Sequence, residues 1–279
     1  MGNQPAEKGL FMSRDEQLEQ MRRKNLFNNT FMSVALRDKQ ACQHVLRILL
    51  EIPDLMVQEV RTQYAIPQLV SKDSVLDVLA EDSRKKLYNI EIQRTDTVDH
   101  AKRVRYYGAM IDSEFLRKGK PYQDMPDVYL IYISETDLWK HGFAIYQVKK
   151  SLQEVRPYDD GMRVLYINAA VDDGTARARL MRYFRTADPE DQSQGALSER
   201  VHYLKTEEGG IREMDDLLEE VYLEGKEKGR EEGRVEEAKR LVFRMFVRGD
   251  SVEEVQVFLD MPLSQIEAWK REWEAEQQG

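Results

Sequence analysis

The sequence predicts an α/β fold, with a central mixed sheet flanked by helices and a helical region after it. Residues 74–94 alternate as two strands joined by a polar turn, which is typical of a β-hairpin. Apolar spacing over about 98–117 indicates a long helix, and the apolar run 127–134 indicates a buried strand. Strands and helices therefore mix along the chain, which favours one sheet with helices packed on it.

Composition sets limits on the class of protein. The 279 residues suffice for one substantial α/β domain and a smaller appendage. No apolar run approaches the length of about 20 residues that spans a membrane, and the first residues contain no apolar signal core, so we expect a soluble, cytoplasmic protein with no membrane partner. The single cysteine, Cys42, excludes an internal disulfide and a cysteine zinc cluster, and we interpret it as a packing residue of an apolar helix.

The net charge of −9 argues against indiscriminate binding of nucleic acid. Basic clusters could still contact phosphate, although each one taken singly is more typical of a solvated surface. These clusters are Arg84–Lys86, Lys102–Arg105, Arg117–Lys120, and the series Arg177, Arg179, Arg182 and Arg185.

The remaining elements follow in chain order. Residues 1–24 form a polar tail, and a helical pattern then runs from Asn29 until Pro53 ends it. We expect strands at 57–60 and 64–70 before the hairpin, and at 142–147, paired beside 127–134, and 163–168 after it. Helical periods follow at 175–184, 197–205 and 211–223, so residues 191–223 are predicted to be a helical extension.

Residues 224–240 contain six Glu and six Lys or Arg, with glycine at every fourth position from Gly225 to Gly233. We interpret this segment as a solvated, bendable helical linker, because each glycine costs a helix about 1 kcal/mol relative to alanine. Helix pairing between protomers is the alternative. Residues 241–279 then predict a small helical module that resembles a helix-turn-helix, with capping boxes at Ser251–Glu254 and Ser264–Glu267. Glutamates offset its basic residues, which favours packing or oligomerisation over DNA reading.

The hairpin contains the candidate site. If it is symmetric about Arg84, Asp77 and Glu91 face each other across the strands. Two carboxylates that close repel each other, and a divalent cation between them removes the repulsion, because hard cations prefer oxygen ligands. The alternative is an edge hairpin with one wet face. Asp77, placed in an otherwise apolar run, favours the metal site.

Asp77 followed by Glu91-Ile92-Gln93 resembles the Asp…(Asp/Glu)-x-Lys core of the PD-(D/E)XK nucleases. It is most similar to their Rpn-type branch of recombination-promoting nucleases, the PD-(D/E)XK family transposases, in which Gln commonly takes the last position. The resemblance covers roughly residues 25–240, including the glycine-punctuated segment. It continues through Lys102–Tyr107, Gly119–Tyr122, Val128–Ile133, Leu180–Thr186 and Glu199–Lys205.

The resemblance implies a restriction-endonuclease-like core at residues 25–190 and a metal-dependent DNA endonuclease activity, with a part in recombination or transposition. Asp77, Glu91 and the backbone carbonyl of Ile92 would hold Mg²⁺, with Mn²⁺ as the alternative, against a scissile phosphate oxygen. Gln93 would join them as a catalytic residue, in the place where most of these enzymes have Lys. A Gln can orient water by hydrogen bonding but supplies no positive charge.

The helix after the hairpin supplies further candidates. Arg103 and Tyr107 lie four residues apart and hence on one face. In the family interpretation they, together with Tyr106, Lys102 and Arg105, support the site or bind the DNA backbone. In the alternative interpretation the tyrosines are core residues and Arg103 is their neighbour with its charged end in water.

The first helix could lend an additional acid to the metal. Similar proteins tend to carry Asp just before a Phe-Met pair, and here Thr30 stands in that place before Phe31. Glu51 and Glu59 are then the candidate substitutes.

Two other functions stay open. Thr30 and Gln93 both favour a catalytically silent DNA- or protein-binding descendant of the nuclease fold, although both core carboxylates are present. A structural oligomer built on the glycine-rich helices is a third interpretation. Double-strand cutting with one active site per chain would favour a homodimer.

Overall fold

The computed structural model describes residues 16, 19–20, 22–66, 74–94, 99–116, 119–153 and 156–277. The chain divides into two compact units, Met1–Asp215 and Asp216–Gly279. The boundary lies inside the predicted helical extension. In the part of the chain that is described, no helix has the length and apolar character needed to cross a membrane.

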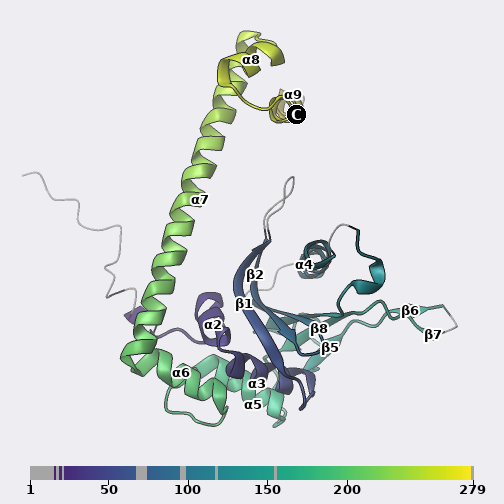
Figure 1. Cartoon of the computed structure of the whole chain (residues 1–279), viewed down its shortest axis with the longest axis vertical. Coiled ribbons are helices and arrows are strands. Elements are labelled where there is room, and N and C mark those ends of the chain that lie inside the picture. Colours follow the sequence, from purple (N-terminus) through teal and green to yellow (C-terminus); the bar gives the residue numbers. More distant parts are fainter. Residues whose placement is uncertain are drawn as a thin grey trace, which may run out of the picture. The chain divides into compact units, whose positions relative to one another are not determined.

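A mixed six-stranded sheet forms the centre of the first unit, in the order β1-β2-β3-β4-β8-β5 (Figure 1). Strands β1 to β3 pair antiparallel, β3, β4 and β8 pair parallel, and β5 pairs antiparallel with β8. Their bounds are β1 Val57–Ile66, β2 Ser74–Asp82, β3 Leu87–Gln93, β4 Val128–Ser134, β5 Ile145–Gln147 and β8 Met162–Asn168. The predicted mixed sheet is therefore confirmed, although residues 67–70 of the second expected strand segment lie outside the described residues.

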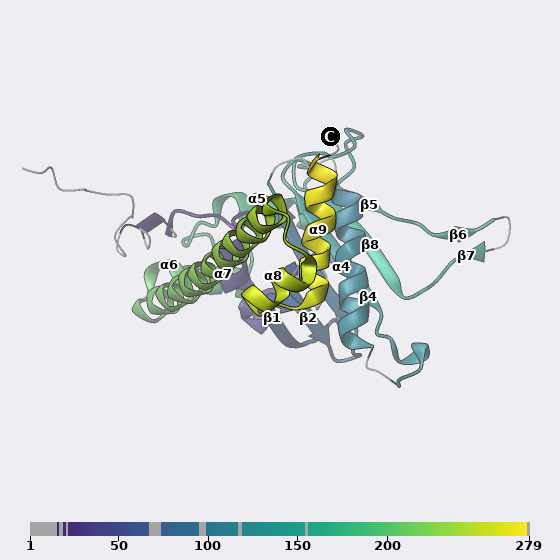
Figure 2. The ribbon, with the colours of Figure 1, turned by 90° about the horizontal axis from the view of Figure 1, so that it is seen from above.

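The expected pairing of residues 142–147 beside 127–134 is wrong. Strand β8 pairs along the whole of β4, from Val128↔Met162 to Ser134↔Asn168, whereas β5 is a short strand on the far edge of β8. The longer ladder satisfies more backbone groups, and it therefore takes the inner position. Strands β6 (Ser151–Leu152) and β7 (Arg156–Pro157) form a separate ribbon that extends from the sheet (Figure 2).

Helices cover both faces of the sheet. Helix α4 (His100–Phe115) lies on one face, while α2 (Asn29–Arg37), α3 (Lys39–Leu50), α5 (Ala176–Thr186) and α6 (Ala196–Thr206) lie on the other (Figure 1). A short 3₁₀ helix, η1 (Tyr122–Asp124), precedes β4. Cys42 is fully buried in α3, which confirms its packing role.

The single helix expected from Asn29 to Pro53 is instead two helices. Asp38 adopts an extended conformation that ends α2, and its carboxylate accepts a hydrogen bond from the Ala41 N–H to cap α3. The apolar spacing continues across the break because both helices bury their apolar residues against the same layer. The apolar spacing therefore gave no sign that Asp38 is the N-cap of a second helix.

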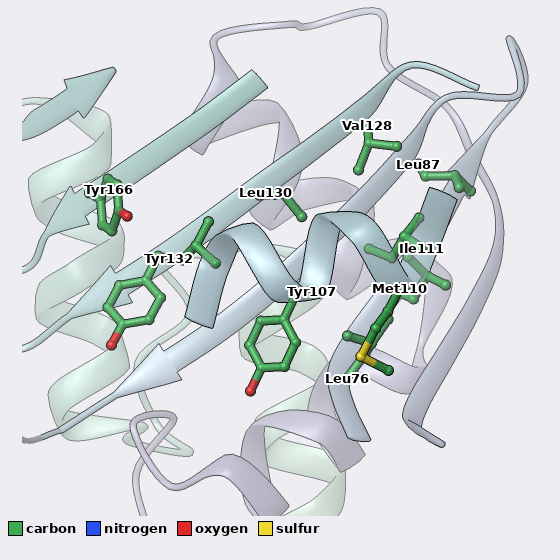
Figure 3. Close-up of a cluster of buried hydrophobic side chains, with 11 residues drawn as sticks. Leu76, Leu87, Tyr107, Met110, Ile111, Val128, Leu130, Tyr132 and Tyr166 are labelled. Atoms are coloured by element: carbon green, nitrogen blue, oxygen red, sulfur yellow. The ribbon is translucent and has the colours of Figure 1, made fainter. Parts of the chain in front are cut away.

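A buried cluster joins α4 to the sheet (Figure 3). Tyr132 and Tyr166 lie at one end of the cluster, Tyr107 lies near its middle, and most of the aliphatic members lie toward the other end (Figure 3). The aliphatic part and Met110 comprise Leu76, Leu79, Leu87, Val104, Met110, Ile111, Val128 and Leu130. The three tyrosines therefore place polar hydroxyls in this otherwise apolar layer.

Helix α7 runs without interruption from Glu208 to Arg248 and includes the predicted linker. Helices α8 (Val252–Leu259) and α9 (Leu263–Gln277) follow, and the Ser251–Glu254 capping box is confirmed in both directions. The second box is wrong, because α9 begins before Ser264. The Pro262 carbonyl accepts from the backbone of Gln265 and Ile266, so the turn residue itself starts the helix.

Candidate active site

The hairpin brings its two acidic residues together. Strands β2 and β3 pair from Glu81↔Leu87 to Val78↔Ile90, a register symmetric about Arg84 as predicted. Asp77 and Glu91 lie directly beyond the last pair, and the Asp77 N–H donates to Glu91 Oε1 at 3.3 Å. Both strands are interior strands of the sheet, and the two side chains are only 6% and 5% exposed. The alternative of an edge hairpin with one wet face is therefore wrong.

Side-chain hydrogen bonds replace the regular ladder around this acid pair. The Ile92 N–H donates to Asp77 Oδ2 at 3.3 Å, and Asn89 Nδ2 donates to Glu91 Oε1 at 3.2 Å. From α2, Asn29 Nδ2 lies 3.4 Å from Asp77 Oδ1. These donors hold the carboxylates in fixed orientations at the end of the β2–β3 ladder.

Burial dominates the electrostatics of the acid pair. It raises the pKa of Asp77 from 3.8 to about 6, against the hydrogen bond from Ile92 and the positive charge of Arg103. Burial and repulsion from Asp77 raise the pKa of Glu91 well above its ordinary value. Water-poor surroundings thus disfavour two negative charges here, and a bound cation would relieve that cost.

The acid pair is a two-carboxylate site. Within the described ranges, no group of three or more His, Cys, Asp or Glu side chains is arranged to hold a metal ion. Any cation bound between Asp77 and Glu91 would therefore draw its other ligands from amide, backbone or water oxygens. Hard cations such as Mg²⁺ accept such ligands and keep several waters.

Sequence reasoning missed the polar neighbours of the acid pair, namely Asn29, Asn89 and Gln63. The β1–β2 register, with Thr62↔Val78 and Tyr64↔Leu76 on either side, places Gln63 opposite Asp77. Its Nε2 donates to Ser33 Oγ at 2.7 Å, and hydrogen bonding from Gln63 also lowers the pKa of Asp77.

Gln63 has a φ of 50°, a left-handed conformation in the middle of a strand. A side chain other than glycine costs about 1–2 kcal/mol in that region. Such strain persists where the surrounding structure holds it and is concentrated at functional sites. A glutamine in a polar stretch carries no sequence signal for this geometry.

Helix α4 places its arginine beside the end of β3. Arg103 Nε donates to the Tyr107 hydroxyl at 2.8 Å, and Arg103 Nη1 donates to Gln93 Oε1 at 3.3 Å. Tyr107 is buried, which raises its pKa to about 12, and Tyr106 is half-buried against the same cluster. The tyrosines are thus core residues, as the alternative interpretation proposed, but Tyr107 also anchors an arginine next to Gln93.

The other basic candidates divide into two groups. Lys102 and Arg105 are exposed on α4 and have no partner among the residues that the structure describes. Most of the remaining cluster residues bind within the protein. In the turn of the hairpin, Arg84 pairs with Asp54, Lys85 with Glu81, and Lys86 with Asp127. On α5, Arg177 contacts Glu51 and Arg182 contacts Asp172. The other two arginines of α5 donate to backbone carbonyls, Arg179 to that of Gly174 and Arg185 to that of Ala169. Arg117 and Lys118 lie outside the described residues.

Glu51 and Glu59 are not brought to the acid pair, so their candidacy as additional ligands is wrong. Glu51 caps the end of α3 with a 77% exposed side chain paired to Arg177. Glu59, which is 53% exposed, pairs with Arg61 and lies opposite Glu81 at the far end of the hairpin. The first helix contributes the amide of Asn29, which contacts the Asp77 carboxylate, and the hydroxyl of Ser33, which donates to the Asp77 backbone carbonyl at 3.2 Å.

A mixed sheet flanked by helices, with two acidic residues side by side on adjacent strands, is the arrangement of the class of PD-(D/E)XK nuclease-like proteins. A family model described as "PD-(D/E)XK nuclease family transposase" matches residues 37–237, and the chain belongs to that family. The predicted restriction-endonuclease-like fold is thereby confirmed. No curated protein and no solved structure matches the chain.

Proposed function

We propose that this protein is a metal-dependent DNA endonuclease that hydrolyses phosphodiester bonds at the acid pair of β2 and β3. The observation that carries the proposal is the buried juxtaposition of Asp77 and Glu91, held in register by the hairpin. Burial raises the pKa of both carboxylates, which means that their ionised forms destabilise the folded protein. A divalent cation bound between them would remove this destabilisation. Family membership favours nuclease chemistry at this place.

The donor set fits a hard cation. Two carboxylates provide oxygen ligands, and the backbone of Ile92 can provide another. In an extended strand the N–H and C=O of one residue point the same way. Because the Ile92 N–H donates to Asp77, its carbonyl also points toward β2, beyond the last paired residues of the ladder. Mg²⁺ or Mn²⁺ would bind there and would supply charge stabilisation to the phosphate and a lower pKa to the attacking water.

The protein's own side chains then have separate roles. Gln93 orients the attacking water by hydrogen bonding, and its side chain is in turn held by Arg103. Arg103 supplies the positive charge that a lysine at position 93 would otherwise bring. Since its Nε is fixed by Tyr107, the guanidinium is oriented before the substrate arrives, which is the condition for effective transition-state stabilisation. The exposed Lys102 and Arg105 on the same helix contact flanking phosphates.

Nicking of supercoiled plasmid by the purified protein tests this function, with Mg²⁺, Mn²⁺ or a chelator. Asp77→Asn and Glu91→Gln should each abolish metal-dependent nicking, whereas Glu51→Ala and Glu59→Ala, prepared identically, should retain it. Cleavage that survives both core substitutions would overturn the proposal. A folded protein that cuts in neither metal would instead support a catalytically silent DNA- or protein-binding descendant, which Gln93 in place of Lys and Thr30 in place of an acid also favour.

The proposal extends to the wider role. Cutting of DNA would promote recombination or transposition, as in the Rpn-type branch, and would take place in the cytoplasm. Cutting of both strands by one site per chain would favour a homodimer. Sedimentation of the protein with and without DNA would test the dimer.

A further inference from the structure

An aromatic cluster lies in line with the acid pair across the sheet. Glu91 pairs with Tyr132 on β4, Tyr132 pairs with Tyr166 on β8, and Tyr166 pairs with Tyr146 on β5. Residues paired between neighbouring strands point to the same face, so these three tyrosines continue the row that Asp77 and Glu91 begin. The candidate site therefore borders an aromatic surface.

The loop after β4 extends this surface to solvent. The Trp139 ring lies 4.8 Å from those of Tyr146 and Tyr166 and 5.2 Å from that of His100, measured between centroids. Trp139 is nevertheless 38% exposed, and Phe143, whose ring lies 5.7 Å from that of Tyr146, is 62% exposed. The Trp139 and Phe143 rings thus pack against the tyrosine row on one side and are open to solvent on the other.

The loop is held rigidly by one carboxylate. Asp137 accepts hydrogen bonds from the backbone N–H groups of Trp139, Lys140 and Gly142 at 2.7–3.2 Å, and from the Tyr146 hydroxyl at 2.6 Å. Lys140 and Gly142 both have positive φ, which the tight turn requires. A preformed loop loses little entropy when a ligand binds, so its exposed rings are suited to contact.

Charge and position favour a nucleic-acid strand as the ligand. The side chains of Lys140 and His141 are exposed between the two aromatic residues, and neither side chain forms a hydrogen bond or ion pair with the residues that the structure describes. The loop leaves β4 at its carboxyl end, directly after Ser134, which pairs with Gln93. Ligands of α/β sheets bind outside the carboxyl ends of parallel strands, and here that edge holds both the acid pair and the loop.

We propose that Trp139 and Phe143 stack on unpaired bases of the strand whose phosphate lies at the acid pair. The preferred substrate would then be single-stranded or locally unpaired DNA rather than intact duplex. This inference rests on the proposed function for the position of the phosphate. Stacking suits a protein with a net charge of −9, because bases stack on aromatic rings whatever their sequence and without requiring a large positive surface.

Binding of a fluorescent single-stranded oligonucleotide by the cleavage-deficient Asp77→Asn protein tests the proposal. Phe143→Ala and Trp139→Leu should each weaken the affinity by about 5- to 150-fold, the effect of losing one stacked base. Tyr122→Ala is the matched control. Tyr122 is also exposed, at 83%, but it precedes the amino end of β4, whereas the aromatic loop follows the carboxyl end of that strand. Its replacement should therefore leave the affinity unchanged.

An oligonucleotide with abasic positions separates stacking from phosphate contact. The abasic oligonucleotide should bind the Asp77→Asn protein as weakly as the intact oligonucleotide binds the same protein with Phe143→Ala added. Equal binding of the intact and abasic strands, or equal weakening of duplex and single-strand binding by Phe143→Ala, would overturn the proposal. Because this assay requires no cleavage, it can fail while metal-dependent nicking succeeds, and the reverse also holds.

Discussion

Replacement of Asp77 by Asn should stabilise the metal-free protein near neutral pH. Burial raises the pKa of Asp77 from 3.8 to about 6. The folded state therefore holds its proton more tightly than the unfolded state, and stability falls as the pH rises from about 4 to about 6. At about 1.4 kcal/mol per pKa unit, the ionised carboxylate costs about 3 kcal/mol above that window. For a domain of this size, Asp77→Asn should then raise the Tm by about 6–12 °C at pH 7.5.

Thermal unfolding of both proteins at pH 4 and pH 7.5, with chelator and with Mg²⁺, measures this effect. The difference should nearly vanish at pH 4, where Asp77 is protonated in the folded state. Mg²⁺ at about 100 times its dissociation constant should stabilise the parent protein by about 2.7 kcal/mol and leave the variant unchanged. An equal difference at both pH values would refute the burial argument, and equal stabilisation of both proteins by Mg²⁺ would refute the metal site.

Asp82→Asn is the matched control for this experiment, because Asp82 lies on the same strand and is also buried, at 4% exposure. Its carboxylate accepts from the Tyr88 hydroxyl at 2.9 Å and from the backbone of Arg84 and Lys86 at 2.8 and 2.9 Å. An amide satisfies these donors less well, so the substitution should destabilise the protein. The two substitutions should therefore have opposite signs at pH 7.5.

Further substitutions test the surroundings of the acid pair. Because φ is positive at position 63, the free energy of unfolding measured in urea should be about 1 kcal/mol lower for Gln63→Ala than for Gln63→Gly. In a regular strand the alanine variant would be the more stable of the two, and that order would contradict the backbone strain at Gln63. Arg103→Gln should slow nicking by about 10²-fold and leave the metal affinity, measured by calorimetry, unchanged. Arg103→Lys should recover part of the nicking rate, because it restores the positive charge. Loss of metal affinity in Arg103→Gln would contradict a role of Arg103 at the phosphate. Gln93→Lys should keep metal-dependent nicking, and complete loss of metal binding would count against the assigned site. Glu51→Ala and Glu59→Ala should each change stability by less than about 0.5 kcal/mol and leave metal affinity intact, since both side chains are exposed.

Sequence periodicity could predict the hairpin because its determinants are local. The period of two and the polar turn around Arg84 suffice to place Asp77 opposite Glu91, and the ladder has that register. The same local reasoning found the face shared by Arg103 and Tyr107 and the capping box at Ser251. It missed the break at Asp38, because a side-chain cap can interrupt a helix without interrupting its apolar spacing.

Contacts between distant segments were beyond that reasoning. Whether an acid lies near the pair depends on how α3 and β1 pack, and packing leaves Glu51 and Glu59 on the surface. The arginines of α5 satisfy carbonyls and carboxylates of neighbouring segments, which no charge pattern reveals. Gln63 reaches Asp77 only through a strained backbone that the antiparallel pairing of β1 holds in place.

By itself the sequence determined the α/β class, the hairpin with its two carboxylates, and membership of the nuclease family, because these depend on short-range patterns and on ordered motifs. Only the tertiary structure decided that the acid pair is buried, that Arg103 stands beside Gln93, and that an aromatic row borders the site. Burial and strand order follow from which surfaces exclude water together, and that is a property of the whole sheet with its helices.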